Sequence, residues 1–347
     1  MSAPDGTPTN PTSPDTSDTP ASPLPDLGRA VIIGAGSMGT LLAAVLGRVM
    51  PVMIVCQEAD RAAQLFRHGA VATGEIEATS EPLIVRSLEH AVSAGGASLV
   101  FVATKTTAIP AVADELKRHL PSLNPSGAVH VISFQNGIDP GRELMRRLDH
   151  PHVLRMVLTL GAVMEPDGSA VGIRINSPPH AIGSVDPAHA LICDQLAEAL
   201  TRAGLGTRHE PDIEAAVWGK GLLNAAMNPV AALCNCTVGE VIDAPARIIF
   251  DKLIAEGLAV ARAEGIDLPD DYTTLVDGLV HRARDHVPSM VEDIRQGRES
   301  EVGQLGRQII EHGRRLGVPT PTHETVDALI ETFDWKVYQR AAANGQA

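Results

Sequence analysis

The stretch Ala30-Val-Ile-Ile-Gly34-Ala-Gly36-Ser-Met-Gly39 decides the fold of the first half of the chain. Its four leading apolar residues predict a short buried strand, and apolar residues at helical spacing from Leu41 to Leu46 predict a helix directly after it. The turn between them has the spacing GxGxxG, which permits a tight turn, a close approach of the backbone to a pyrophosphate, and close packing of helix on strand. A purely structural glycine turn is the alternative. The phosphate-binding interpretation assigns the turn to Gly34, Ala35, Gly36, Ser37, Met38 and Gly39.

Three further apolar runs, at residues 52–56, 99–103 and 129–134, each end in polar residues. They predict parallel strands, and ligands bind at the carboxyl ends of the strands in an open sheet of this kind. Lys105, after the second run, and Asn136, after the third, are therefore expected to contact cofactor or substrate. The alternatives are an exposed loop charge at Lys105 and a simple turn residue at Asn136.

The residues after the run at 52–56 bear on the choice between NAD and NADP. A dinucleotide-binding fold reads the adenosine ribose at this place, where an acidic residue favours NAD and an arginine favours NADP. Gln57 comes first, Glu58 follows it, and Arg61 lies one turn into the next predicted helix, from which it could reach a 2′-phosphate. Both NADP(H) and NAD(H) stay open on these residues.

The pattern changes from strands to helices near residues 207–213. Before this point, the turn at 166–168 separates extended runs at 158–163 and 169–175, which predicts antiparallel strands added to the sheet. After it, the apolar residues have helical spacing. The predicted fold class is α/β, with an N-terminal Rossmann-type dinucleotide-binding domain at 29–209 and an all-α C-terminal substrate and catalytic domain at 210–347.

Residues 1–28 contain seven prolines and no Lys or Arg. Such a segment cannot bury enough apolar surface to offset its ordering entropy. We expect a disordered tail whose removal leaves stability and activity unchanged.

A helix predicted at residues 218–233 carries a polar stripe on an otherwise apolar surface. Lys220, Asn224 and Asn228 are four residues apart, so they share one face. Unpaired amides on a buried helix would each cost roughly 2–7 kcal/mol, so a polar partner or ligand is expected along the stripe. Pro229 is expected to bend the helix there and free the Ala225 carbonyl. In the alternative, Lys220 extends to water and the two Asn side chains bond neighbouring backbone.

Composition excludes several classes of function. The chain has 28 Lys and Arg against 42 Asp and Glu, a net charge of −14, so nucleic acid and anionic membranes are poor partners. It shows neither a secretory signal pattern nor an apolar run near the ~20 residues of a membrane span. Four cysteines without paired CxxC spacing and no HExxH motif predict no disulfide framework and no metal site, and a cytoplasmic location fits best.

Taken in order, the motifs resemble those of the ketopantoate reductase (2-dehydropantoate 2-reductase) family. The resemblance runs from about residue 29 to residue 335 and rests on GAGSMG, ATK at 103–105, QNG at 135–137, WxKxxxNxxxNP at 218–229, SMxxD at 289–293 and SE at 300–301. It implies an oxidoreductase that reduces ketopantoate to D-pantoate with NADPH in pantothenate biosynthesis, and a small-molecule 2-keto acid as the partner. A homodimer is one assembly such a chain could form.

The resemblance also implies roles for particular residues. Lys220 corresponds to the family's general acid, Asn224 and Asn228 to residues that contact substrate, and Ser289 and Glu301 to further groups that meet the substrate. Lys105 and Asn136 correspond to residues that line the cofactor and active-site cleft. From the residues alone, Ser289 with Glu292 also has capping-box spacing, and Glu301 also complements a helix dipole.

Two positions depart from the family's usual pattern. Gln57 stands where members that use NADPH usually carry Arg, and His286 stands where they often carry Asn. Relatives of similar shape act on branched or aromatic 2-keto acids with NAD, so an NAD-dependent 2-hydroxy acid dehydrogenase is the alternative. A non-catalytic nucleotide-sensing protein is the alternative of another class, and it would not need the polar stripe.

Overall fold

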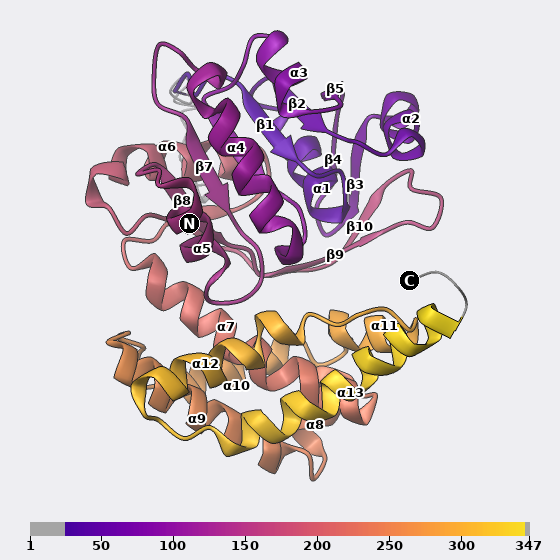
Figure 1. Ribbon diagram of the computed structural model, residues 1–347, viewed down its shortest axis with the longest axis vertical. Coiled ribbons are helices and arrows are strands. Elements are labelled where there is room, and N and C mark those ends of the chain that lie inside the picture. Colours follow the sequence, from indigo (N-terminus) through magenta and orange to yellow (C-terminus); the bar gives the residue numbers. More distant parts are fainter. Residues whose placement is uncertain (1–24, 344–347) are drawn as a thin grey trace, which may run out of the picture.

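The computed structural model describes residues 25–343, with side chains through residue 339, and consists of an α/β half followed by a helical half (Figure 1). The strands are β1 (Ala30–Ile33), β2 (Val52–Val55), β3 (Ala70–Gly74), β4 (Ala78–Ser80), β5 (Leu83–Val85), β6 (Leu99–Val102), β7 (His130–Ser133), β8 (Val153–Val157), β9 (Leu160–Met164), β10 (Val171–Asn176), β11 (His180–Gly183) and β12 (Thr207–His209).

Helices connect and follow these strands. They are α1 (Ser37–Leu46), α2 (Ala59–His68), α3 (Leu88–Ser93), α4 (Ile109–Leu123), α5 (Pro140–Leu148), α6 (Ala190–Arg202), α7 (Ile213–Cys234), α8 (Val238–Asp243), α9 (Arg247–Glu264), α10 (Tyr272–Arg282), α11 (Ser289–Arg295), α12 (Gly306–Leu316) and α13 (Pro321–Ala343). Short 3₁₀ turns lie at η1 (Thr106–Ala108), η2 (Pro187–His189) and η3 (Val302–Gln304). The predicted α/β fold class is confirmed.

The main sheet has the strand order β12-β11-β8-β7-β6-β1-β2-β5. Strands β5, β2, β1, β6, β7 and β8 run parallel, β11 pairs antiparallel with β8, and β12 pairs parallel with β11. Strands β2 and β5 lie on one side of β1, and the chain then returns to add β6, β7 and β8 on the other side. The strand order therefore reverses at β1. Ligands of open α/β sheets bind at the carboxyl ends of the strands at such a point.

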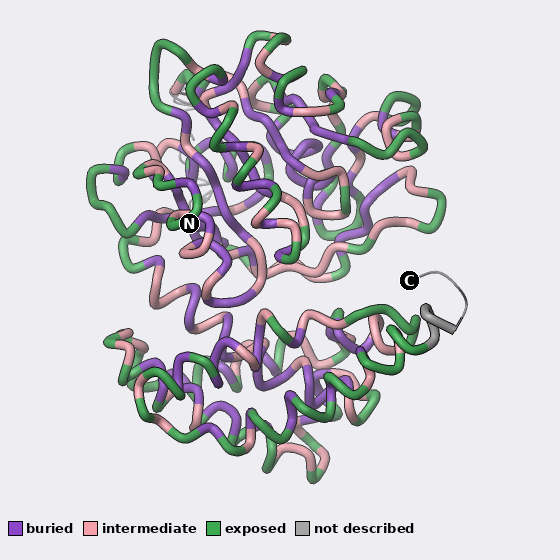
Figure 2. The backbone as a smooth tube through the Cα atoms, in the orientation of Figure 1, coloured by how far each residue is buried: buried purple, intermediate pink, exposed green. Residues whose placement is uncertain are grey.

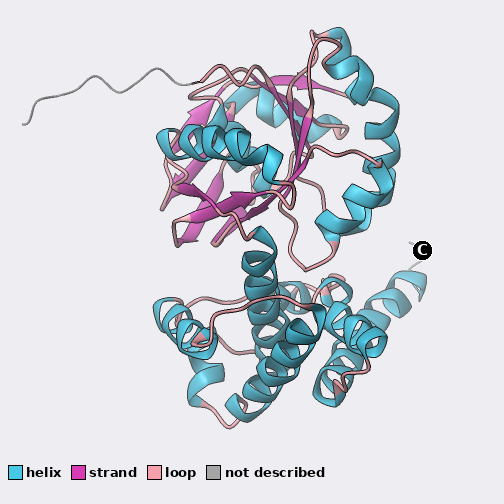
Figure 3. Ribbon diagram, turned by 90° about the vertical axis from the view of Figure 1, so that its left-hand side faces the viewer, coloured by secondary structure: helices cyan, strands magenta, loops and turns pink. Residues whose placement is uncertain are grey.

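Both faces of the sheet are buried because successive side chains of a strand point to opposite sides. Ile32, Phe101 and Ile132 belong to one apolar core, to which α1 and α6 contribute. Val31, Val100 and Val131, the preceding residues in the same strands, belong to a second core covered by α3, α4 and α5. Figure 3 shows the sheet between helices on its two sides, and in Figure 2 its strands are largely buried.

The hairpin predicted around residues 166–168 forms, but it does not extend the main sheet. Strands β9 and β10 pair antiparallel, as predicted, and β10 then pairs parallel with β3 in a separate sheet of order β4-β3-β10-β9. The sequence pattern gave the strand type and the turn correctly. It could not identify β3 and β4 as the partners, because pairing over this sequence distance depends on tertiary packing.

Helix α7 leads from the sheet into the helical half and forms the centre of that half (Figure 1). Asp212 caps it by accepting the amide N–H of Ala215 at 3.1 Å, and Asn235 ends it in the left-handed conformation. The helix passes through Pro229 without interruption, so Pro229 does not end it. Trp218, Leu222 and Ala226 are fully or almost fully buried in the core of this half.

Other helix ends bear on the sequence analysis. Thr237 and Glu240 form a capping box at the start of α8, and Gly265 ends α9 in the left-handed conformation. The alternative capping role of Ser289 is wrong: Pro288 precedes the first helical residue of α11, and Ser289 makes no capping bond.

The first 24 residues of the predicted tail lie outside the described part of the chain. Residues 25–28 are described and depart from the expectation, because Leu27 is buried against the main core. The Ser98 hydroxyl donates to the Leu27 carbonyl at 2.5 Å. The packed part of the chain therefore begins before residue 29, and removing all of residues 1–28 would remove an apolar contact. None of the described helices combines the length and the apolar character needed to cross a membrane.

Candidate active site

The glycine turn has the geometry that a pyrophosphate requires. Gly34 has φ +106°, in the region that favours glycine, and a Cβ on Gly39 would lie 1.9 Å from the Gly34 carbonyl oxygen. A Cβ on Gly36 would meet nothing within 4 Å, so the turn leaves open space beside its backbone. Helix α1 begins there with neither a side-chain cap nor an acidic residue in its first turn, so the first N–H groups are available to an anion. The residues present fit the diphosphate of a dinucleotide.

Arg61 secures this turn from α2. Its guanidinium donates to the Ala35 carbonyl at 2.9 Å, to the Thr40 hydroxyl at 2.7 Å and to the Gly168 carbonyl at 2.5 Å. These bonds join α2, the glycine turn and the β9–β10 hairpin. The side chain that the sequence offered as a reader of a 2′-phosphate is therefore occupied with protein acceptors.

A second arginine, Arg86, lies beside Gln57. Gln57 and Glu58 are exposed directly after β2, and the guanidinium of Arg86, which follows β5, donates to the Gln57 carbonyl. Arg86 is itself exposed. Sequence analysis missed Arg86 because the pairing of β5 with β2, which brings it here, is a tertiary contact.

Lys220 and Asn136 meet across the two halves of the molecule. The Lys220 ammonium donates to the Asn136 side-chain oxygen at 3.0 Å, although the two residues are 84 positions apart. Asn136 follows β7 at the carboxyl edge of the sheet, and Lys220 lies near the start of α7. Asn224, one turn further along α7, lines the same small pocket as these two residues.

The environment of Lys220 favours proton release. Burial lowers the pKa of Lys220 to about 8, although the negative charge of Glu301 acts in the opposite direction. His180, at the start of β11, is fully buried, and burial together with the charge of Lys220 lowers the pKa of His180 to about 4. Lys220 is therefore the cation of the pair at neutral pH.

The tautomer of His180 follows from its partners. The Thr159 amide N–H donates to Nδ1 at 3.1 Å, so Nδ1 carries no proton, and Nε2 therefore donates to the Asn176 side-chain oxygen at 3.1 Å. The sequence offered no signal for His180, because no motif surrounds it.

The loop that carries Asn136 is held from both halves. The Gln308 side-chain oxygen, from α12, accepts the N–H groups of Ile138 at 2.6 Å and Asp139 at 3.2 Å. Arg155, from β8, donates to the Ile138 carbonyl at 2.6 Å. Sequence analysis missed both residues, because only the assembled fold shows a side chain bonded to a distant backbone.

The remaining predicted residues do not all line the pocket beside Lys220. The pocket beside Lys220 is lined by Asn136 and Asn224, and not by Asn228, Ser289 or Glu301. Asn228 lies one turn beyond Asn224 on the same side of α7, and Ser289 is exposed at the start of α11, which packs along α7. Lys105 is exposed after β6, at the same sheet edge as Asn136.

A dinucleotide-type turn at the edge of a sheet where an amide holds a half-buried lysine is typical of a class of protein, the oxidoreductases that use a nicotinamide dinucleotide. Within that class, the chain belongs to the ketopantoate reductase family. The pattern described as "Ketopantoate reductase PanE/ApbA" matches residues 30–174, and that described as "Ketopantoate reductase PanE/ApbA C terminal" matches residues 212–334.

Relatives with an assigned name support this membership. The 2-dehydropantoate 2-reductase of Streptococcus pyogenes serotype M6 is 25% identical over 306 residues, which cover 86% of this chain and 95% of that protein. That of Mesorhizobium japonicum is 26% identical over 321 residues, with 87% and 96% covered.

Solved structures share the fold. A ketopantoate reductase of the same family from Ralstonia eutropha aligns with a TM-score of 0.77 at 23% identity, over 89% of this chain and 99% of that one. A D-mandelate dehydrogenase solved with NADH and anilino(oxo)acetate aligns with a TM-score of 0.78 at 20% identity, over the same shares of the two chains.

Proposed function

We propose that the chain reduces the ketone of a 2-keto acid, with ketopantoate as the substrate and NADPH as the cofactor, to give D-pantoate. The observation that carries the proposal is the bond of 3.0 Å between Lys220 and Asn136 in a pocket at the carboxyl edge of the sheet. In the proposal, residues 29–209 bind the dinucleotide through the glycine turn, and residues 210–347 supply the proton donor and the substrate contacts.

The chemistry assigned to this chain is proton donation. When bound, a reduced nicotinamide supplies a hydride to the ketone carbon. The Lys220 ammonium donates a proton to the ketone oxygen as negative charge develops there, and its positive charge stabilises that oxygen in the transition state. Asn136 orients the Lys220 ammonium, because the Asn136 side-chain oxygen accepts one of the three N–H groups of that ammonium.

Substrate contacts are proposed along the cleft between the two halves. Asn224, which lines the pocket beside Lys220, is proposed to bond the substrate there, and Asn228, Ser289 and Glu301 are proposed to bond its more distant polar groups. Glu301 is proposed to accept a hydrogen bond from the hydroxyl of ketopantoate, since a carboxylate at neutral pH only accepts. A keto acid without that hydroxyl would not use it.

An NAD-dependent 2-hydroxy acid dehydrogenase is the second candidate, and a specific observation favours it. Gln57 replaces the arginine that members using NADPH usually carry, and the Arg61 guanidinium is occupied by the glycine turn and the hairpin. The similar structure of a D-mandelate dehydrogenase was solved with NADH.

One assay separates the candidates. The purified chain is given a panel of 2-keto acids that includes ketopantoate and phenylglyoxylate, each with NADPH and with NADH, and kcat/KM is measured for every combination. We expect the highest value for ketopantoate with NADPH. A highest value for an aromatic or branched keto acid with NADH supports the second candidate, and nucleotide binding without turnover contradicts both.

The pH dependence of the reaction should report Lys220. A proton donor acts in its protonated form, which is present below its pKa and lost as pH rises through it, so kcat/KM for reduction should fall above a pH of about 8. Because Glu301 raises that pKa, Glu301→Gln should move the alkaline limb to lower pH. Glu299→Gln is the matched control, since Glu299 is exposed two residues earlier and should leave the limb in place. A limb that does not move in Glu301→Gln argues against the charge coupling.

Arg86 should determine the preference between the two cofactors. A hydrogen bond to a charged group contributes about 1.5–3 kcal/mol, so Arg86→Gln should lower kcat/KM with NADPH roughly 10–100-fold and change it little with NADH. Gln57→Arg should act in the opposite direction, and Arg67→Gln, an exposed change on α2, is the control. An unchanged ratio of the two cofactors in Arg86→Gln would show that another group reads the ribose.

A further inference from the structure

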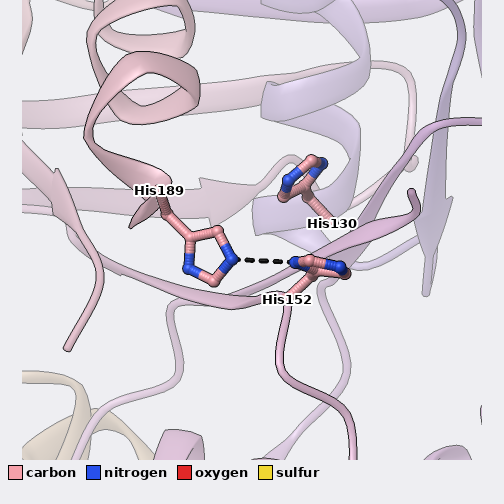
Figure 4. Close-up of side chains that lie close together, drawn as sticks. All are labelled: His130, His152 and His189. Carbon is pink, nitrogen blue, oxygen red and sulfur yellow. Dashed lines mark hydrogen bonds between the residues drawn. The ribbon is translucent and has the colours of Figure 1, made fainter. Parts of the chain in front are cut away.

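Three histidines from separate segments lie close together (Figure 4), at the edge of the main sheet that carries the start of β7 and β8. His130 is the first residue of β7, His152 directly precedes β8, and His189 ends η2. One imidazole nitrogen from each lies within 4.8 Å of the other two. This edge carries the amino ends of the parallel strands, whereas Asn136 and Lys220 lie at the carboxyl ends. The cluster is therefore separate from the candidate active site.

The shortest contact in the cluster joins two ring nitrogens. Nδ1 of His152 lies 2.8 Å from Nε2 of His189 (Figure 4). Two nitrogens at this distance share a proton, because two lone pairs facing each other would repel. Two lone pairs can also be brought this close when both bind one cation in place of the proton.

A neighbouring serine orients the His189 ring for such binding. Ser184 accepts the Asp186 amide N–H at 3.1 Å through its hydroxyl oxygen, and the same oxygen lies 2.9 Å from Nδ1 of His189. When Nδ1–H of His189 donates a hydrogen bond to the Ser184 hydroxyl oxygen, Nε2 of His189 carries a lone pair and can act as a metal ligand. A hydrogen bond to the second ring nitrogen is the usual means by which proteins fix a metal-binding histidine.

The surroundings of His130 and His152 favour the neutral form of the ring, which is the form that metals bind. Burial lowers the pKa of His130 to about 4, with further lowering by the charges that His152, His189 and His150 would carry. Burial also lowers the pKa of His152, with further lowering by the charges that His189 and His150 would carry. The negative charge of Asp186 acts in the opposite direction. Protons therefore compete weakly for the ring nitrogens of His130 and His152 near neutral pH.

We propose that His130, His152 and His189 form a binding site for one divalent transition-metal ion. Imidazole ligands suit Zn²⁺, Cu²⁺, Ni²⁺ and Fe²⁺, and a Zn–N bond of about 2.0–2.1 Å in tetrahedral geometry separates two ligand nitrogens by roughly 3.3 Å. The observed separations, from 2.8 Å for the shortest pair to an outer limit of 4.8 Å, bracket that value. Small side-chain movements would complete three ligands, and water would supply the fourth.

The position of the site assigns it a structural role. Its ligands come from β7, from the segment entering β8 and from the connection between β11 and α6. A bound ion would therefore join the parallel part of the sheet to the region where β11 pairs antiparallel with β8. Sequence analysis predicted no metal, because these histidines are spread over 60 positions without a spacing that marks a site.

The test uses the full chain, freed of metal by a chelator and titrated with Zn²⁺. We expect one equivalent to bind and the melting temperature to rise with Zn²⁺ concentration, because an ion that binds only the folded state stabilises it. His152→Gln should weaken binding more than about 100-fold, since even outer partners of a metal ligand account for about 10–100-fold. His281→Gln, an exposed change on α10, should bind as the native chain does. Native-like Zn²⁺ affinity in His152→Gln, or no stoichiometric binding to the native chain, would overturn the proposal.

A second measurement needs no variant and therefore applies even if His152→Gln fails to fold. The native chain is treated with diethyl pyrocarbonate with and without Zn²⁺, and the modified histidines are located by mass spectrometry. We expect Zn²⁺ to protect His130, His152 and His189 while His281 reacts equally in both samples. Equal modification of the three histidines with and without Zn²⁺ contradicts the site.

Discussion

Replacing Lys220 by alanine should lower kcat for keto acid reduction by about 10²–10⁴-fold, the usual contribution of a positioned proton donor. The affinity for NADPH should change little, because the Lys220 side chain bonds Asn136 in a pocket that Asn224 also lines, and the dinucleotide is assigned to the glycine turn. The measurements are steady-state kcat and KM, NADPH binding by fluorescence, and the melting temperature, since a half-buried charge can also affect stability.

Two controls accompany this prediction. Lys252→Ala changes an exposed lysine in the same half of the molecule and should leave kcat unchanged. Small primary amines added to Lys220→Ala should restore part of the rate if a proton donor, and not merely a folded helix, has been removed. Near-normal turnover in Lys220→Ala would show that the polar stripe of α7 is structural.

Replacing Glu214 by alanine should lower the free energy of unfolding more than any other substitution proposed for this chain. Arg155 is 4% exposed, and its guanidinium pairs with Glu214 at the start of α7. Burial lowers the pKa of Arg155, and Glu214 opposes that effect. Removing one partner of a buried ion pair leaves an uncompensated charge and typically costs about 3–5 kcal/mol. Urea unfolding should show this loss in the free energy of unfolding.

Glu143→Ala is the matched control for this change. Glu143 pairs with Arg147 at 2.8 Å on the exposed side of α5, four residues away. Exposed pairs of this spacing contribute about 0.3–0.5 kcal/mol. If Glu214→Ala costs no more than Glu143→Ala, the Arg155–Glu214 pair does not hold α7 against the sheet.

Local patterns predicted most of the fold correctly. The glycine turn, the apolar runs that became β1, β2, β6 and β7, and the change to helices before α7 follow from side-chain periodicity and turn chemistry. The separate sheet of β3, β4, β9 and β10 was missed, since pairing between distant strands depends on tertiary packing. Leu27 was missed for a similar reason, because one apolar residue in a proline-rich segment shows no periodicity.

The same limit applies to the site. Lys220, Asn224 and Asn136 could be selected because helical spacing and strand ends indicate their positions, and the structure brings them to one pocket. His180, Arg86 and the three clustered histidines have no local signal, because each reaches its neighbours through strand order or a connection that sequence does not reveal. Arg61 had a signal, but the assembled fold gives its guanidinium other partners.

The most direct test of the central claim is a single turnover. The native chain is loaded with NADPH, mixed with ketopantoate in a stopped-flow instrument, and followed by the loss of reduced-nicotinamide absorbance. We predict one equivalent of NADPH oxidised in a fast phase, slowed about 10²–10⁴-fold in Lys220→Ala with NADPH still bound. A native chain that binds NADPH but does not oxidise it with ketopantoate or any other 2-keto acid would contradict the account.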